Sequence, residues 1–156
     1  MSLSIHLAVL GPLQNNVYFL VDDDSGDTVL IDPSFEPQTQ LRLASEQGWE
    51  LRQIWLTHGH YDHTAGAKQV SQAFAPPLPI AMHPDGFTWA ENHPEGIKMG
   101  VQVDPVPRLD IPLAHGMWLD VVPGGSRKLV EVRDVSRASP RLAAFLHPRI
   151  GDGCRG

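Results

Sequence analysis

Short apolar runs alternate with turn residues along the chain, a pattern typical of strands and helices packed in layers. Residues 17–21 and 28–31 are β-branched, aromatic or aliphatic, and the Asp-rich segment 22–27 between them predicts a hairpin. A further strand is predicted over 51–56 and a short buried one over 78–82. Strands that alternate with helical segments in this way predict an α/β layered fold.

Two helices are expected between these strands. The first begins near Pro37 and ends at Gly48, a residue suited to the left-handed conformation that follows a helix. The second covers residues 67–74, where apolar positions recur every three or four residues. The Pro- and Gly-rich segment 84–116 is interpreted as a short helix followed by a loop and a hairpin. Two more strands are expected over 117–122 and 129–135.

Composition narrows the class of protein. The chain has 156 residues, 42% of them hydrophobic and 19% charged, which is ordinary for one globular domain. No apolar run is long enough to span a membrane, and the first residues lack the pattern of a signal peptide. The lone cysteine, Cys154, excludes an internal disulfide and a cysteine-built zinc site. A cytoplasmic protein without a membrane partner is therefore expected.

Charge divides the chain into two parts. Residues 1–126 carry five Lys or Arg and fifteen Asp or Glu, a balance of −10, whereas residues 127–156 carry seven and three, a balance of +4. An acidic body repels the phosphate backbone, so a nucleic-acid partner is not expected.

Candidate metal ligands cluster directly after the strand predicted over 51–56. His58, His60, Asp62 and His63 lie within six residues, and their imidazole and carboxylate groups suit Zn²⁺, Fe²⁺ or Mn²⁺, with zinc favoured by the number of imidazoles. In an extended segment His58 and His60 project the same way and can bind one ion. Asp62 and His63 follow a turn and could bind a second. The alternative is a polar loop with incidental histidines, which the complete string disfavours.

The string Thr-His-Gly-His-Tyr-Asp-His-Thr-Ala-Gly at 57–66 resembles the signature of the metallo-β-lactamase superfamily, and its part over 61–66 is most similar to the glyoxalase II-like hydrolases. Residues 16–20, 29–33 and 80–84 also resemble segments of that family. The resemblance implies an αββα sandwich with a dinuclear metal site at one edge, between the two sheets. We expect the two glycines of the string, Gly59 and Gly66, to relax the backbone constraints of the turn.

The resemblance also implies roles for the residues. His58 and His60 would bind the first metal, and Asp62 and His63 the second. Asp32 would support the segment that carries these ligands, residues 57–66, which we call the metal loop. It would do so by holding a ligand imidazole or a backbone N–H, although it could be only a turn former beside Pro33. A bound cation would activate water for hydrolysis of a thioester, ester or lactam, with Asp62 as the catalytic residue that orients the water or accepts its proton.

The C-terminal part departs from the family pattern. After the strand at 129–135 the family has Pro-Gly-His-x-Pro-Gly, whereas this chain has Ser-Arg-Ala-Ser-Pro-Arg, with Ala138 in the place of the histidine. Asp152 follows a glycine as a family ligand does, but it comes too early in the chain. We therefore expect a domain over 1–135, the N-terminal half of the sandwich with part of the second, and a divergent basic tail over 136–156. The tail is interpreted as a reading-frame disturbance or truncation, or alternatively as a genuine basic tail for an acidic partner.

Three functions remain open. The leading hypothesis is a glyoxalase II-like metallohydrolase of a small-molecule substrate. The second is a catalytically inactive, metal-poor remnant that is at most a binding module. The third, a nucleic-acid-processing branch of the same family, is disfavoured by the acidic body. An incomplete sandwich would leave its inner sheet face uncovered, so self-association through an exposed sheet face is also expected.

Overall fold

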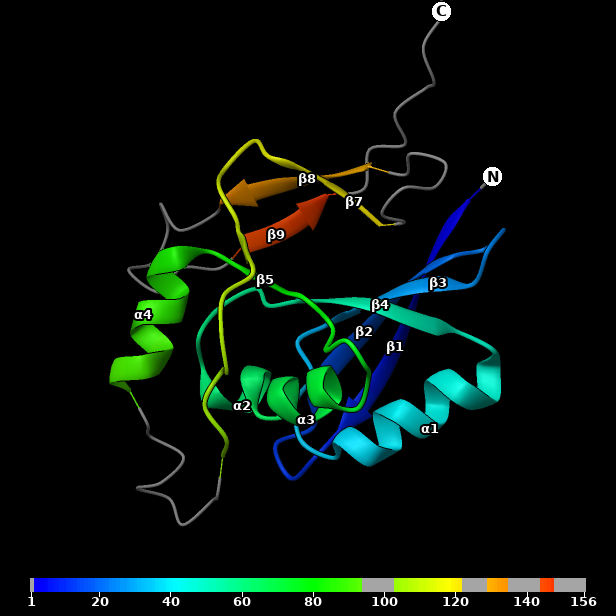
Figure 1. Ribbon diagram of the computed structural model, residues 1–156, viewed down its shortest axis with the longest axis horizontal. Helices are drawn as coiled ribbons and strands as arrows, with labels where there is room; N and C mark the ends of the chain where they lie inside the picture. The colour runs from blue at the N-terminus through cyan, green and yellow to red at the C-terminus, as the bar shows by residue number, and fades with distance from the viewer. Residues whose placement is uncertain (1, 94–102, 122–128, 135–143, 148–156) are drawn as a thin grey trace, which may run out of the picture.

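Two β-sheets and the helices beside them form the part of the chain that the computed structural model describes, residues 2–93, 103–121, 129–134 and 144–147 (Figure 1). The larger sheet has the order β1-β2-β3-β4-β5-β6, and the smaller has the order β7-β8-β9. The strands of the larger sheet are β1 (Leu3–Leu10), β2 (Asn15–Asp22), β3 (Asp27–Ile31), β4 (Glu50–Trp55), β5 (Ile80–Met82) and β6 (Ile111–Pro112). The strands of the smaller sheet are β7 (Trp118–Asp120), β8 (Leu129–Asp134) and β9 (Ala144–His147).

The larger sheet changes from antiparallel to parallel pairing at β3. Strands β1, β2 and β3 pair antiparallel, and the predicted hairpin is confirmed with Tyr18 opposite Ile31. Strands β3 to β6 pair parallel, which requires crossover connections. These contain α1 (Pro37–Gln47) before β4, α2 (Tyr61–Thr64) and α3 (Ala67–Gln72) before β5, and α4 (Pro84–Asn92) before β6. The C-terminal ends of β3, β4 and β5 therefore lie at one edge of the sheet.

Helix α1 has the ends that the sequence predicts. Pro37 occupies its first turn, where the missing N–H costs no hydrogen bond. Gly48 ends the helix with a φ of 72°, and its N–H donates back to the carbonyl groups of Ala44 and Ser45. The conformation at Gly48 is one that a residue with a side chain rarely adopts, so the glycine fixes the point at which the chain turns into β4.

One face of the larger sheet packs against α1 and α3. Alternate residues of β2 point to this side, because successive side chains of a strand face opposite ways. Val17, Phe19 and Val21 are buried there together with Leu30 of β3 and Ile54 of β4. The helices contribute Ala44, Ala67 and Val70 to the same core.

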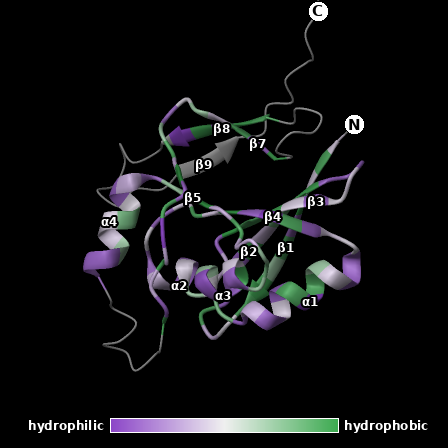
Figure 2. Ribbon diagram, viewed as in Figure 1, coloured by the Kyte–Doolittle hydropathy of each residue, from purple (hydrophilic) through white to green (hydrophobic). Residues whose placement is uncertain are grey.

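The opposite face of the larger sheet packs against the smaller sheet, so the two sheets form the inner layers of a sandwich. Leu20, Val29 and Trp55 are buried in one cluster with Val130 and Val132 of β8. Figure 2 shows hydrophobic segments on strands of both sheets. The expectation of an uncovered inner face is therefore wrong over β2 to β5, because β7 and β8 fold back far enough to cover it.

Part of the inner face remains exposed at β1, an edge strand that the sequence analysis did not predict. Ile5, Leu7 and Val9 are 54–56% exposed. Their partners on β2 include Leu20 and Tyr18, which face the smaller sheet, so the exposed stripe continues the sandwich interface. Self-association through this stripe stays a prediction.

Two further predictions have mixed outcomes. Helix α4 is confirmed, but β6 does not form a hairpin: it joins the larger sheet parallel to β5. Within the predicted tail over 136–156, residues 144–147 form β9 and pair with β8. Residues 135–143 and 148–156 lie outside the described residues, and with them Ala138, Asp152 and Cys154. None of the helices in the described ranges is long and apolar enough to cross a membrane.

Candidate metal centre

The candidate ligands lie at the C-terminal edge of the parallel strands. Asp32 follows β3 directly, and residues 57–63 leave the end of β4. Because β3 and β4 are parallel neighbours, their exits are side by side, which is where α/β sheets bring polar groups of separate loops together. The Asp32 N–H donates to the carbonyl of Trp55 at 3.0 Å, which joins the two exits.

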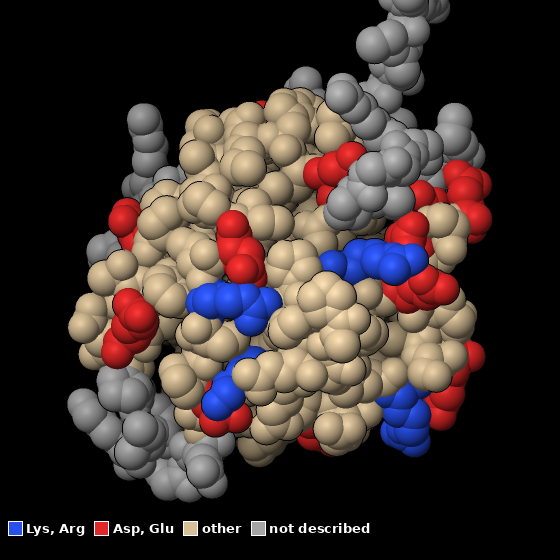
Figure 3. Space-filling view, viewed as in Figure 1, with Lys and Arg blue, Asp and Glu red and all other residues tan. Residues whose placement is uncertain are grey.

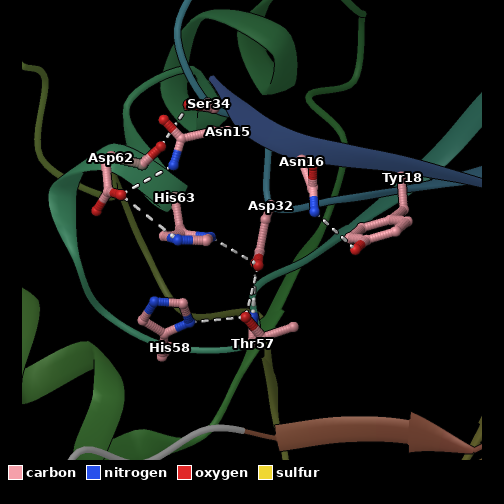
Figure 4. A network of polar contacts seen from close by, with 9 residues as sticks. All are labelled: Asn15, Asn16, Tyr18, Asp32, Ser34, Thr57, His58, Asp62 and His63. Atoms are coloured by element: carbon pink, nitrogen blue, oxygen red, sulfur yellow. Dashed lines mark hydrogen bonds and ion pairs between the residues drawn. The ribbon is translucent and has the colours of Figure 1, made fainter. Parts of the chain in front are cut away.

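Asp32 is the hub of a hydrogen-bond network (Figure 4). Its Oδ1 accepts from the Thr57 N–H at 2.8 Å, and its Oδ2 accepts from the Thr57 hydroxyl at 2.5 Å. The same Oδ2 lies 3.1 Å from His63 Nδ1. The side chain of Asp32 is only 5% exposed, so these contacts satisfy a buried carboxylate. Asp32 thus holds both a backbone N–H and an imidazole of the metal loop.

The network determines which nitrogen of two histidines can bind a metal. His63 Nδ1 faces the Asp32 carboxylate and so carries the proton, which leaves Nε2 as the basic nitrogen. The single hydroxyl proton of Thr57 goes to Asp32, so the contact of 2.8 Å between Thr57 Oγ1 and His58 Nδ1 requires His58 to donate. His58 therefore also presents Nε2 as its basic nitrogen.

The two imidazoles have opposite shifts of pKa. Burial, followed by the charge of His63, lowers the pKa of His58 from 6.5 to about 4, so His58 is neutral near neutral pH. Burial also acts to lower the pKa of His63, but the hydrogen bond to Asp32 and the charges of Asp32 and Asp62 outweigh it and raise that pKa. A neutral imidazole is the form that binds a metal ion, so the lowered pKa of His58 favours binding, whereas the raised pKa of His63 makes proton release a larger part of binding at that residue.

Asp62 and His63 face each other as two ligands of one ion would. Asp62 Oδ2 lies 3.5 Å from His63 Nε2. Two ligand atoms that are each roughly 2.1 Å from a tetrahedral zinc ion are about 3.4 Å apart, so the observed separation fits. Asn15 lies behind this pair, and its Nδ2 donates to Asp62 Oδ2 at 2.8 Å.

The three histidine rings form one contiguous group. The ring centroid of His58 is 4.0 Å from that of His63 and 4.8 Å from that of His60. Asp32, His58 and His63 also place one ligand atom each within 4.8 Å of one another. His58 thus lies between the other two rings, and the contacts run from His60 through His58 and His63 to Asp62. A set of imidazoles and one carboxylate fits Zn²⁺, Fe²⁺ or Mn²⁺ by its donor chemistry.

A side chain at either glycine of the motif would clash with a neighbouring backbone carbonyl. A Cβ on Gly59 would lie 2.4 Å from the carbonyl oxygen of Gly86 in α4, and a Cβ on Gly66 would lie 2.4 Å from that of Ser34. Neither glycine has a positive φ. The expectation that they supply conformational freedom is therefore wrong: they let α4 and the loop after β3 approach the metal loop. Ser34 Oγ also donates to the carbonyl of Asp62.

Several residues of the site were missed by the sequence analysis. Asn15, Thr57 and Ser34 each hold part of the metal loop, and only Thr57 lies in the motif. Trp89 of α4 is a further residue at the site, since its ring lies edge-on to His60 with the ring centroids 4.8 Å apart. The spacing of Trp89 in the sequence does not reveal this contact, because the fold of α4 over the loop creates it.

Comparisons with known proteins show which family the chain resembles. A model of the metallo-beta-lactamase superfamily matches residues 10–144. A hydroxyacylglutathione hydrolase of Ruegeria pomeroyi is 31% identical over 136 residues, which are 86% of this chain and 44% of that protein. A probable metallo-hydrolase of Bacillus subtilis, YqgX, is 30% identical over 101 residues, 63% of this chain and 46% of that protein.

Solved structures show the same fold. TTHA1623, in a di-iron-bound form, has a TM-score of 0.73 at 27% identity and covers 92% of this chain and 66% of that one. The BLEG-1 B3 metallo-beta-lactamase has a TM-score of 0.75 at 20% identity and covers 93% and 67%. The chain thus spans less than half the length of the two curated relatives described above. With a family match over residues 10–144, the chain belongs to the metallo-beta-lactamase superfamily.

Proposed function

We propose that this chain is a metal-dependent hydrolase that cleaves a thioester or ester of a small molecule with a water molecule. The single observation that carries the proposal is the Asp62–His63 pair, whose ligand atoms are 3.5 Å apart. Asn15 supports the carboxylate from behind and Asp32 supports the imidazole. A bound divalent cation, which we propose to be zinc, supplies a Lewis acid and lowers the pKa of water to about 7.

The residues around the proposed metal have different roles. His58 and His60 would supply neighbouring imidazoles, whose ring centroids are 4.8 Å apart, and His63 would supply Nε2 beside Asp62. The Asp62 carboxylate is partly exposed, at 23%, and so can reach a water molecule, orient it and accept its proton. Asp32 and Thr57 fix the direction in which His58 and His63 point, so the site needs little rearrangement to bind.

The names of the relatives support the proposed substrate class. Several curated relatives are named hydroxyacylglutathione hydrolases, including those of Ruegeria pomeroyi and Maricaulis maris. We therefore favour an acyl thioester in the cytoplasm over a nucleic acid. On the face shown in Figure 3, Lys and Arg side chains lie beside Asp and Glu side chains instead of forming a continuous basic surface. Three pairs of this kind are Arg52–Asp27, Lys68–Asp104 and Arg108–Asp110.

The test is hydrolysis of a hydroxyacylglutathione thioester by the purified chain loaded with Zn²⁺. The free thiol that hydrolysis releases is measured over time. Asp62→Asn keeps the size of the side chain but removes the base, so we expect a loss of turnover of about 100-fold or more. Glu91→Gln removes an exposed carboxylate of α4 as a matched control and leaves turnover unchanged. A metal-loaded chain without turnover, or equal turnover in Asp62→Asn, contradicts the proposal.

The second candidate function is an inactive, metal-poor remnant that at most binds a partner. The observation that favours it is Ala138, which stands where the family resemblance places a histidine ligand of the first metal. A catalytic zinc site usually has three protein ligands, so a site without this histidine would bind more weakly. A folded chain that takes up no zinc and shows no turnover with added zinc supports this alternative.

A further inference from the structure

Asn15 has a buried amide side chain of which only one polar atom makes a hydrogen bond to the described part of the chain. It is the first residue of β2 and only 8% exposed. Its Nδ2 donates to Asp62 Oδ2 at 2.8 Å, across 47 positions of sequence. Its Oδ1 is buried and accepts no hydrogen bond within the described residues.

An amide in this position is a poor choice for stability alone. A buried polar atom without a partner costs free energy, because it gives up its hydrogen bonds to water on folding. The one bond that the amide makes goes to a carboxylate that is 23% exposed, which water could also solvate. An apolar side chain of similar size would therefore serve the metal-free fold at least as well, so the amide serves the carboxylate.

The orientation of Asp62 shows what the amide does. Asp62 Oδ2 receives the Asn15 donor and at the same time faces His63 Nε2 at 3.5 Å. Ser34 Oγ donates to the backbone carbonyl of Asp62 and so holds the main chain, but only Asn15 among the described contacts holds the carboxylate from the side of the sheet. Without Asn15 the carboxylate is free to rotate away from His63.

We propose that Asn15 is a positioning residue that sets the metal affinity of the Asp62–His63 half of the site. The inference rests on the proposed function, because it requires that this pair binds a metal. Residues that hold ligands in place change metal affinity by about 10- to 100-fold when they are replaced. The loss should be confined to the ion at Asp62 and His63, since the Asn15 amide donates its hydrogen bond to Asp62.

Two substitutions and a neighbouring control test the proposal. Asn15→Leu removes the donor together with the unpartnered oxygen, and Asn15→Asp keeps the shape but replaces the donor by an acceptor. Asn16 is the next residue of β2, and its amide donates instead to the Tyr18 hydroxyl at 3.3 Å. Asn16→Leu is therefore the matched control. Metal-free protein is titrated with Zn²⁺ against a chromophoric chelator, and thermal unfolding of the metal-free protein is measured in parallel.

We expect wild type and Asn16→Leu to bind two ions, and both Asn15 variants to lose affinity for one of them by about 10- to 100-fold. The thermal midpoint of metal-free Asn15→Leu should equal or exceed that of wild type. Two ions bound with unchanged affinity in both Asn15 variants would overturn the role of Asn15 alone. A folded wild type that binds no zinc would overturn the proposed function and this role with it. If Asn15→Leu does not fold, Asn15→Asp decides by the same titration.

Discussion

Replacing Asp32 by Asn should reverse the direction in which the pKa of His63 is shifted. Burial lowers the pKa of His63, but the hydrogen bond and charge of Asp32, together with the charge of Asp62, raise it above 6.5. In Asp32→Asn the burial remains while the hydrogen bond to a carboxylate and the charge of Asp32 are lost. The pKa of His63 should then fall below 6.5. Asn also tolerates the φ of 51° at this position, so the change adds little backbone strain.

The same substitution should destabilise the metal-free protein. Two contacts go from Thr57 to the Asp32 carboxylate, and one joins it to His63. An Asn side chain has only one acceptor oxygen, so one of these donors faces an NH₂ group. The free energy of unfolding should fall by about 1–3 kcal/mol, the range for a buried donor left unpaired.

The loss of unfolding free energy in Asp32→Asn should be larger at low pH than at high pH. A raised histidine pKa stabilises the fold below the unfolded value of 6.5, and this contribution disappears as the pH rises through the folded pKa. The difference between wild type and Asp32→Asn should therefore be larger near pH 6 than near pH 8.5. Urea unfolding at the two pH values measures it.

The assay for the pKa itself is an NMR titration of the histidine rings in metal-free protein. Asp110→Asn is the matched control, because Asp110 also accepts from a backbone N–H, that of Ile80 at 2.8 Å, but lies outside the metal loop. The control should lose stability and leave the pKa of His63 unchanged. A pKa of His63 that stays above 6.5 in Asp32→Asn would refute the reasoning.

Three further predictions follow from other parts of the structure. Gly59→Ala places a Cβ 2.4 Å from the Gly86 oxygen, so it should cost about 1–3 kcal/mol in urea unfolding; unchanged stability would contradict the close approach. Zinc binding should release a proton from His63, more at pH 6 than at pH 8, in calorimetry with buffers of different ionisation enthalpy; equal release at both pH values would argue against the raised pKa. Wild type should self-associate through β1 in analytical ultracentrifugation and Leu7→Glu should be monomeric; a wild-type monomer at all concentrations would count against the exposed stripe.

Much of the larger sheet could be predicted from local patterns. The hairpin of β2 and β3, helix α1 with its glycine end, and β4 followed by the metal loop all carry signals within a few residues of themselves. The strand β1 was missed although Ile5, Leu7 and Val9 alternate with other residues, which is a strand period. The strand β6 has only two residues and no period of its own, so its parallel pairing with β5 depends on the tertiary fold.

The ligand types could be predicted from the motif, but the groups that hold them could not. His58 and His63 are close in sequence to each other, whereas Asn15 reaches Asp62 from 47 positions away. Asp32 was assigned a supporting role only through resemblance to the family. The predicted role of Gly59, to relax the backbone, was wrong. A side chain is excluded there by the carbonyl of Gly86, and this group belongs to a helix that packs on the loop.

The measurement that tests the central claim most directly is the zinc content of the purified chain after equilibrium dialysis. Wild type should retain close to two zinc ions per chain, and the double substitution His58→Ala and His60→Ala should lose at least one of them while the fold is preserved. His6→Ala with His115→Ala, which removes two exposed imidazoles elsewhere, should retain the wild-type content. Equal zinc content in the folded His58 and His60 variant, or none in folded wild type, would contradict the account.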